Sequence, residues 1–406
     1  MRALVADLSS LPRVAWAAAG SRLRHDLPWR RGGLLRLREL PEPSLPGDDW
    51  VRVRPTLSGV CGSDVKLLHV GLSPLLSAYN PGTRAVPGHE TVGVVTDVGP
   101  AVERVAPGDR VLLDPVTGCV AKGLEPCPSC AAGDYHVCRR MADAGRSGVG
   151  QGQGFSDRLG GGWADAVVAH DTQCHLVPAG VPDERAVLAE PAAVALHAVL
   201  RWQRAGDRAV VIGPGSVGLL VTATLRRLHP DLDVTVVTAG EFGAQRALAA
   251  GADRTVGQPS AAVLESVAAH LGARLLRPRV GRLPVLDGGA DVVFDCIGTA
   301  STIDLALRLL RPRGTLVLVG TAGRVRLDLS LVWFRELTVH GTICYGEEGA
   351  LDGRRAFAEV VDWLADPAYA VDGLVTHTLP LERYAEALDA ATRGPGAGAV
   401  KVTFRP

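Results

Sequence analysis

Three short segments of the chain carry side chains that together could hold a catalytic metal ion. Cys61 lies in GVCGSD, His89 lies in PGHE, and Glu190 lies in LAEP. An isolated cysteine or histidine is more often a core or surface residue. The three segments together and in this order are hard to produce by chance. A thiolate, an imidazole and a carboxylate are a usual ligand set for catalytic zinc, which leaves a fourth position open for water or substrate.

Followed by the dinucleotide-binding turn at 213–218, this ligand set predicts metal-assisted hydride transfer. Zinc would hold the oxygen of an alcohol while hydride departs, or polarise a carbonyl in the reverse direction. Glu90, next to His89, is interpreted either as a ligand when the site is empty or as a neighbouring group that tunes the metal. Ser63, two residues after Cys61, is interpreted as the first acceptor of the alcohol proton. The alternative for Ser63 is a turn hydroxyl bonded to its own backbone.

A second group of cysteines indicates a closed metal site, which we call the cysteine lobe. Its pattern C-x7-C-x2-C-x7-C comprises Cys119, Cys127, Cys130 and Cys138. Four thiolates close in sequence can enclose a structural zinc. Cys119 has an alternative as a buried thiol, with Glu125 or water as the fourth ligand. The remaining thiols have no partner spacing and are predicted core residues: Cys174, Cys296 and Cys344.

A glycine-rich turn between the two halves of the chain indicates a dinucleotide site. It follows the apolar run at 209–212 and opens a helical pattern, the context in which G-x-G-x-x-G is informative. Its glycines allow a tight turn and the close approach of a pyrophosphate to the positive end of a helix. The residues assigned to the cofactor are Gly213, Gly215, Ser216, Val217 and Gly218.

The residue that selects between NAD and NADP should end the next strand. Thr238 stands where an NAD-specific protein would carry an aspartate, and a neutral residue removes the charge repulsion against a 2′-phosphate. Arg246 is the nearest candidate to bind that phosphate, whereas Glu241 could still serve NAD. The pattern leans towards NADP. Cys296 and Gly320 end or follow two later strands and are further predicted cofactor contacts.

The spacing of apolar residues predicts two kinds of domain. Up to about residue 191, short β-like runs alternate with Gly and Pro, which suggests a barrel-like β domain. From 208 to about 341, strand and helix patterns alternate, which is typical of a doubly wound parallel sheet. Mixed patterns return from 342 to 406. We interpret 8–45 as a long loop or excursion and 260–289 as irregular backbone.

Composition excludes several classes of partner. The length of 406 residues permits two cores, and the formal net charge of zero without a basic run favours neither nucleic acid nor membrane. No secretory signal opens the chain, and eight cysteines then point to metal ligation or buried thiols rather than disulfides. We therefore predict a cytoplasmic protein. Of 43 basic residues three are lysines, which we attribute to genomic base composition.

Taken together, these motifs resemble the zinc-dependent medium-chain dehydrogenase/reductase superfamily over nearly the whole chain. Glu190, in place of a cysteine, resembles the polyol, threonine and glucose dehydrogenase branch. The resemblance implies an α/β protein with a GroES-like catalytic domain at 1–191 and 342–406, split by a Rossmann domain at 192–341. It implies catalytic zinc at Cys61, His89 and Glu190, structural zinc in the cysteine lobe, and a homodimer or homotetramer.

The chain departs from the pattern of this family at three places. Five extra residues separate Cys119 from its usual distance to Cys127. Lys66 stands where many relatives carry a histidine that relays the proton. Thr238 replaces the cofactor-selecting acid. The excursion at 8–45 is also longer than is common.

The sequence thus predicts a zinc- and NAD(P)-dependent dehydrogenase. Its substrate would be a secondary alcohol or ketone of a small polar molecule, such as a sugar, cyclitol or hydroxy amino acid. Two alternatives stay open at this point. One is a zinc-independent NADPH reductase of enones or quinones with the same fold, and the other is a non-catalytic dinucleotide-binding sensor.

Overall fold

A computed structural model describes residues 1–30, 32–80, 82–148, 150–155, 158–203, 206–257, 260–281 and 283–406. The described chain divides into two compact units. Unit 1 comprises Met1–Ala193, Cys344–Asp366 and Asp372–Pro406, and unit 2 comprises Val194–Ile343 and Pro367–Val371. Among the described residues, no helix combines the length and the apolar character that crossing a bilayer requires.

Unit 1 is built on a mostly antiparallel sheet, as the alternation of short apolar runs predicts. In its described part the strand order is β19 (Val375–Pro380), β20 (Lys401–Arg405), β3 (Trp50–Gly59), β5 (Thr91–Val98), β6 (Arg110–Leu113) and β8 (Cys174–Leu176), and β7 (Val167–His170) also pairs with β3. Alternate side chains of these strands point into one core, which includes Val51, Val53 and Val95.

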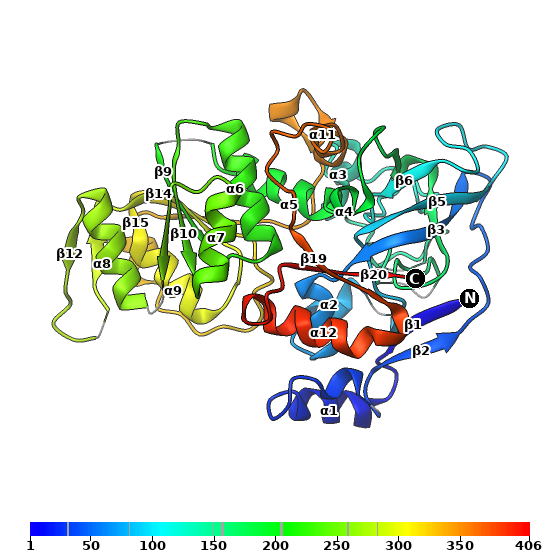
Figure 1. The fold of residues 1–406 in the computed structure, drawn as a ribbon, viewed down its shortest axis with the longest axis horizontal. Coiled ribbons are helices and arrows are strands. Elements are labelled where there is room, and N and C mark those ends of the chain that lie inside the picture. Colours follow the sequence, from blue (N-terminus) through cyan, green and yellow to red (C-terminus); the bar gives the residue numbers. More distant parts are fainter. Residues whose placement is uncertain are drawn as a thin grey trace. The chain divides into compact units, whose positions relative to one another are not determined.

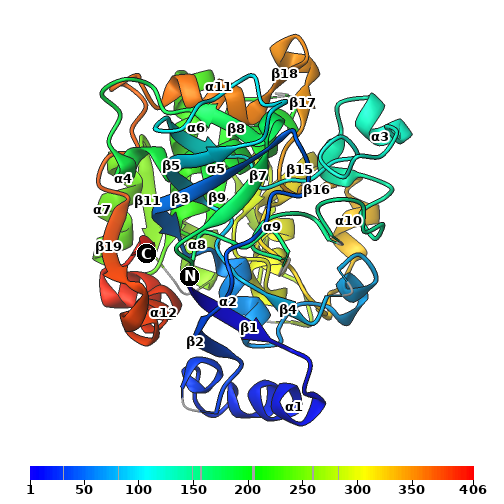
Figure 2. The same cartoon turned by 90° about the vertical axis from the view of Figure 1, so that its right-hand side faces the viewer.

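The segment 8–45 is not the long loop that the sequence predicted. It contains α1 (Leu11–Gly20) and β2 (Leu35–Glu39), and β2 joins β1 (Arg2–Asp7) and β4 (Arg84–Ala85) in a second sheet. Figure 2 shows α1 beside β1 and β2. The segment orders because Ala17, Trp29 and Leu34 bury their side chains in one core cluster with residues of α12 (Tyr384–Arg393). Its Arg, Pro and Gly content conceals this apolar face in the sequence.

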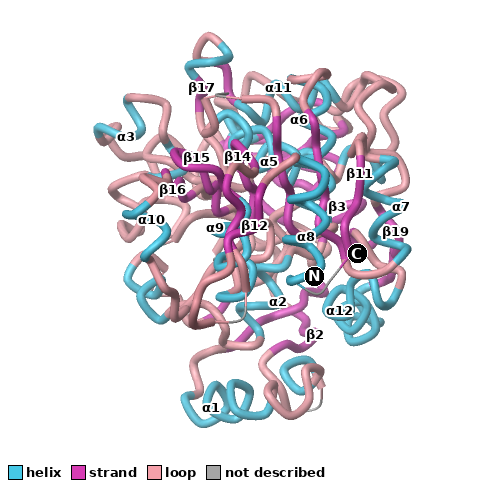
Figure 3. The backbone as a smooth tube through the Cα atoms, turned by 90° about the vertical axis from the view of Figure 1, so that its left-hand side faces the viewer, coloured by secondary structure: helices cyan, strands magenta, loops and turns pink. Residues whose placement is uncertain are grey.

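Unit 2 contains the predicted parallel sheet. Its described strands run in the order β11 (Arg254–Gly257), β10 (Asp233–Thr238), β9 (Arg208–Ile212), β14 (Ala290–Asp295), β15 (Leu310–Leu318) and β16 (Thr338–Gly341). All neighbouring pairs are parallel. The helices beside the sheet include α6 (Ser216–Leu228), α7 (Glu241–Ala249) and α9 (Ala300–Leu309), as Figures 1 and 3 show. The chain builds the sheet outward from β9 in one direction to β11 and then from β14 in the other direction. Dinucleotides bind at this switch point in such sheets.

The segment 260–289 is more regular than the sequence predicted. It forms α8 (Ser260–Leu271) and a hairpin of β12 (Arg274–Leu276) with β13 (Val285–Asp287). Val263, Leu264 and Val267 recur at helical spacing and are buried in the core of unit 2. The prolines and glycines that suggested irregular backbone lie in or beside the hairpin.

The other described α-helices and strands are mostly shorter than these, except the 12-residue α5. They are α2 (Gly62–Leu68), α3 (Pro128–Ala131), α4 (Asp183–Ala186), α5 (Ala189–Leu200), α10 (Ser330–Phe334), α11 (Ala356–Trp363), β17 (Glu347–Glu348) and β18 (Arg354–Arg355). Within unit 1, α2 lies beside α12 (Figure 1).

Candidate functional site

The end of β3 and the start of β5 bring three predicted residues together in unit 1. The Cys61 thiol, a ring nitrogen of His89 and a carboxylate oxygen of Glu90 lie within 4.8 Å of one another. Cys61 precedes α2, and His89 and Glu90 directly precede β5. The two strands are antiparallel, with Ser58 opposite Thr91, so the end of one meets the start of the other. Sheet pairing therefore supplies the proximity of the three side chains.

Asp64 is a positioning residue that the sequence did not reveal. Its Oδ2 accepts a hydrogen bond from the Cys61 backbone N–H at 3.0 Å, and its Oδ1 lies 3.4 Å from His89 Nδ1. Burial by itself would lower the pKa of His89, but the Asp64 carboxylate and the Cys61 thiol raise it well above its usual value. Phe155 stacks on the His89 ring with a centroid distance of 5.4 Å.

These donors fit a zinc ion. Neither His89 Nδ1 nor Asp64 Oδ1 has a hydrogen-bond partner of good geometry among the described residues. A carboxylate on one ring nitrogen is the usual arrangement around a zinc-binding histidine, and it leaves the other nitrogen for the metal. The partly exposed Cys61 thiol beside that ring adds a sulfur donor of the kind that zinc prefers.

Glu90 is held by a buried lysine. Lys401 Nζ donates to both carboxylate oxygens at 2.7 Å, and both side chains are buried. A Cβ at position 59 would lie 1.7 Å from Glu90 Oε2, so Gly59 is the residue that leaves room for the carboxylate. Because both oxygens are engaged, the contacts favour Glu90 as a neighbour of the metal over a ligand.

Glu190 lies in the first turn of α5 and is buried. The group of mutually close donors does not include it. Burial raises the pKa of Glu190 to about 8, against the opposing charge of His89. Its assignment as a third zinc ligand stays a prediction. The proton-accepting role of Ser63, in the first turn of α2, stays a prediction as well.

The cysteine lobe is assembled as predicted. One ligand atom from each of its four cysteines lies within 4.8 Å of the others, with Cys119 included. The Cys138 Sγ lies 3.6 Å from that of Cys119 and 3.9 Å from that of Cys127. Four sulfur atoms at tetrahedral positions on zinc would be about 3.8 Å apart. The observed spacing fits that ion and favours Cys119 over Glu125 as the fourth ligand.

Backbone N–H groups point at the sulfur atoms of the lobe. The Cys127 N–H donates to Cys119 Sγ at 3.4 Å, and the Arg140 N–H donates to Cys138 Sγ at 3.3 Å. Burial by itself would raise the pKa of Cys127, but the backbone N–H groups of Cys130 and Arg139 help to lower it to about 6. These backbone groups therefore favour the thiolate form of Cys127, whereas burial raises the pKa of Cys130 and of Cys138.

The predicted dinucleotide turn joins β9 to α6 in unit 2. Gly213 has φ +104°, in the region that favours glycine. A Cβ at Gly218 would lie 1.9 Å from Gly213 O, so the helix can approach the strand only without a side chain there. A Cβ at Gly215 would meet nothing within 4 Å, which leaves open space before Ser216 and Val217 at the start of α6. A pyrophosphate needs that space.

Thr238 is buried at the end of β10, and Glu241 begins α7. Glu241 Oε1 accepts a hydrogen bond from Gln245 Nε2 at 3.1 Å. The Arg246 guanidinium lies 5.3 Å from the centre of the Phe242 ring. The assignments of Thr238 and Arg246 to cofactor selection stay predictions.

Asp295, at the end of β14, is a second residue that sequence reasoning missed. Its Oδ1 accepts hydrogen bonds from the backbone N–H groups of Ile297 and Gly298 at 2.9 and 3.1 Å. These bonds fix the turn that contains Cys296. A Cβ at Gly320 would lie 2.3 Å from the carbonyl carbon of Ile297, so this turn also explains the glycine. Contact of Cys296 and Gly320 with the cofactor stays a prediction.

Of the three cysteines predicted to lie in the core, only one is buried. Cys174 is buried, but Cys296 and Cys344 are partly exposed. Both lie in loops that follow strands, where the chain leaves the core. Cys344 has φ +46°, and its Sγ accepts a hydrogen bond from Gln151 Nε2 at 3.0 Å.

Known proteins match both halves of the chain. Residues 47–179 match the family described as alcohol dehydrogenase GroES-like domain, and residues 216–366 match zinc-binding dehydrogenase. The chain is 31% identical to a Mycobacterium tuberculosis protein named "Probable zinc-binding alcohol dehydrogenase Rv1895", over 92% of this chain and 86% of that protein. The chain belongs to the zinc-dependent medium-chain dehydrogenase/reductase superfamily.

Two further similar proteins agree with this assignment to the superfamily. A sorbitol dehydrogenase of Halalkalibacterium halodurans is 26% identical, over 92% of this chain and 96% of that protein. A protein described as a zinc-binding dehydrogenase of Sinorhizobium meliloti, solved bound to NADP, is 28% identical with a TM-score of 0.69, over 92% of this chain and 95% of that one. Unit 1 is thus GroES-like and the sheet of unit 2 is Rossmann-type. The chain is an enzyme of the zinc-dependent alcohol and polyol dehydrogenase family, which uses zinc and NAD(P).

Proposed function

We propose that this enzyme interconverts a secondary alcohol and a ketone on a small polar substrate, such as a sugar, cyclitol or hydroxy amino acid. The observation that carries the proposal is the convergence of Cys61 and His89, with the carboxylate of Asp64 behind the ring. Relatives named for polyols support the substrate class. Cys61, His89 and Glu190 would hold zinc, which supplies Lewis-acid stabilisation of the substrate oxygen.

Other residues of the chain hold the zinc ligands in place, balance their charge and carry the substrate proton. Asp64 holds the imidazole of His89 in one orientation, and Phe155 covers that ring against water. Lys401 neutralises Glu90, so that a second uncompensated carboxylate does not stand beside the ligands. Ser63 takes the proton of the substrate hydroxyl and passes it towards solvent.

The cofactor is proposed to be NADP rather than NAD. Position 238 at the end of β10 carries a threonine and not a carboxylate, and Glu241 accepts a hydrogen bond from Gln245 in its own helix. Arg246 on the same helix supplies a positive charge for a 2′-phosphate. Thr238→Asp should therefore shift the ratio of kcat/KM values towards NAD by at least about tenfold, because a carboxylate there accepts ribose hydroxyls and repels phosphate.

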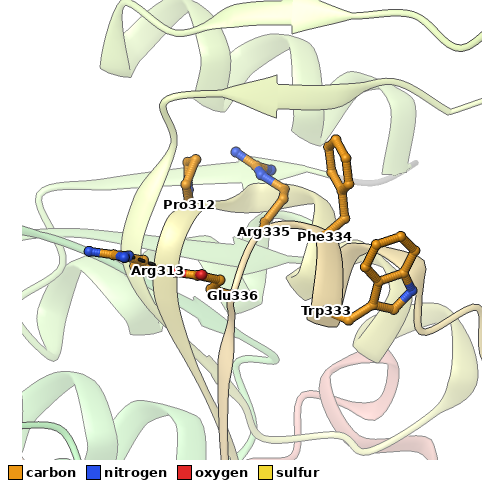
Figure 4. A pocket seen from close by; sticks show the side chains of 6 residues that line it. All are labelled: Pro312, Arg313, Trp333, Phe334, Arg335 and Glu336. Carbon is orange, nitrogen blue, oxygen red and sulfur yellow. Dashed lines mark hydrogen bonds and ion pairs between the residues drawn. The ribbon is translucent and has the colours of Figure 1, made fainter.

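We also propose that two copies associate through the edge strand β16. Among the described strands β16 pairs only with β15, so its other edge offers free hydrogen-bonding groups to a second copy. Close to this strand, Trp333 and Phe334 are 71% and 74% exposed around the hollow of Figure 4. Exposed aromatic side chains of this size mark interfaces. Metal-binding thiols agree with a reducing, cytoplasmic setting.

The proposed catalysis is tested by removing a predicted ligand. Cys61→Ala should lower kcat/KM for any accepted alcohol by at least about a thousandfold, because the metal contributes several kcal/mol. Cys174→Ala is the matched control, since this buried thiol lies outside both groups of described donors. A panel of sugars, cyclitols and amino alcohols, each with NAD and NADP, identifies the substrate. Full activity of the Cys61 variant would refute zinc chemistry.

A further inference from the structure

The segment between Cys119 and Cys127, which we call the inserted segment, places a buried lysine in the cysteine lobe. Lys122 is 1% exposed. Its Nζ donates to the carbonyl oxygens of Arg140, Met141 and Asp143 at 3.2, 2.8 and 2.9 Å. These carbonyls belong to the turn that directly follows Cys138. An ammonium group has three N–H donors, so this site uses all of them.

The main chain of Lys122 closes the same loop from the other side. Its N–H donates to Cys119 O at 3.1 Å, and its carbonyl accepts from the Arg146 N–H at 2.9 Å. Gly145 has φ +50°, and a Cβ there would lie 2.5 Å from Lys122 O. The inserted segment and the turn after Cys138 are therefore joined by both the backbone and the side chain of one residue.

The charge of Lys122 also suits the lobe. Zinc with four thiolates carries a net charge of −2, which is costly to bury without a cation. Burial lowers the pKa of Lys122, whereas the nearby charges of Cys138 and Asp143 oppose that shift. The exposed Arg139 and the half-buried Arg140 lie next to Cys138 in sequence. Lys122 supplies a positive charge from the buried side.

Two of the three lysines of the chain lie at buried positions beside metal donors. The chain uses three lysines among 43 basic residues. Lys122 and Lys401 are both buried, and each lies against one of the two groups of metal donors. A planar guanidinium spreads its donors over a fork and cannot direct three of them from one atom to three converging carbonyls.

We propose that Lys122 is the positioning residue of the cysteine lobe. It fastens the turn after Cys138 to the inserted segment, and thereby sets how slowly the lobe releases its metal. The proposal concerns the structural metal and does not depend on the identity of the alcohol substrate.

The first test measures zinc release from purified full-length protein into a chromogenic chelator, with total zinc per chain determined beforehand. Lys122→Met should release the structural zinc at least about tenfold faster than the wild type, because three charge-assisted hydrogen bonds are lost. Lys122→Arg should also release it faster, since it keeps the charge but not the geometry. Arg139→Met is the matched control, an exposed cation of the same loop, and should release zinc at the wild-type rate.

The second test uses the wild type and needs no variant to fold. Amine labelling followed by mass spectrometry resolves three lysines. In the zinc-loaded protein Lys66, which is partly exposed, should be labelled, while Lys122 and Lys401 are protected. After chelation Lys122 should become labelled before Lys401, which reports global unfolding. Wild-type release rates from Lys122→Met, or labelling of Lys122 as fast as Lys66 in loaded protein, would overturn the proposal.

Discussion

Lys401 and Glu90 form a buried ion pair between the last strand of the chain and the segment before β5. Removing one partner of such a pair leaves an uncompensated buried charge and costs about 3–5 kcal/mol. Lys401→Met should therefore lower the free energy of unfolding by about that amount, as measured by urea denaturation. The double variant Lys401→Met/Glu90→Gln should recover much of the loss. A double variant as unstable as the single one would contradict the pairing.

Asp114 is another buried carboxylate of unit 1, and its titration predicts a pH dependence of stability. Its oxygens accept hydrogen bonds from Val116 N–H at 3.1 Å and from the hydroxyls of Tyr135 and Tyr345 at 3.0 and 3.3 Å. Burial nevertheless raises the pKa of Asp114 to about 6, from 3.8 in the unfolded chain.

The sign follows from this raised pKa. Between pH 4 and 6 the folded state keeps a proton that the unfolded state has lost, so the contribution of Asp114 to stability falls as the pH rises. A difference of about two pKa units corresponds to about 3 kcal/mol. Relative to Asp114→Asn, the wild type should lose up to that much between pH 4 and pH 7, as followed by urea denaturation at each pH. A constant difference between the two proteins would show that Asp114 does not titrate in this range.

At the scale of elements, two glycines of the β9–α6 turn predict different outcomes. Gly218→Ala places a Cβ 1.9 Å from Gly213 O, so the helix must move; Tm should fall and the Kd of the dinucleotide should rise. Gly215→Ala meets no protein atom within 4 Å, so Tm should stay within a few degrees. Its methyl group should still crowd the pyrophosphate and weaken binding by about tenfold or more. Thermal unfolding and fluorescence titration with NADPH separate the two effects.

At the scale of the whole molecule, the exposed aromatic residues beside β16 predict self-association. The wild type should elute as a dimer or a larger even assembly in size-exclusion chromatography with light scattering. Trp333→Ser/Phe334→Ser should shift it towards monomer, because large apolar side chains dominate such interfaces. Val280→Ser is the matched control, since Val280 is 91% exposed on the β12–β13 hairpin of the same unit. A wild type that is monomeric at every concentration would contradict the proposed interface.

The amino-acid sequence by itself determined the features whose parts lie close together along the chain. The cysteine lobe spans 20 residues from Cys119 to Cys138, so chain connectivity alone keeps its thiols near one another. The turn at 213–218 is local for the same reason, because Gly218 leaves room for the nearby Gly213 and Gly213 adopts a positive φ. Alternating apolar strands and helices likewise predict the parallel sheet, because burial of both faces imposes that pattern.

Only the tertiary structure decided which distant side chains meet. Lys401 is 311 residues from Glu90, and no local pattern distinguishes it from a surface lysine. Lys122 was likewise unrecognisable until the fold placed the turn after Cys138 over it. The helix in 8–45 was missed because its apolar residues join a core cluster with residues of α12 that only the fold brings together. Buried charges and packed faces depend on partners that folding brings together, and sequence spacing carries no signal for those partners.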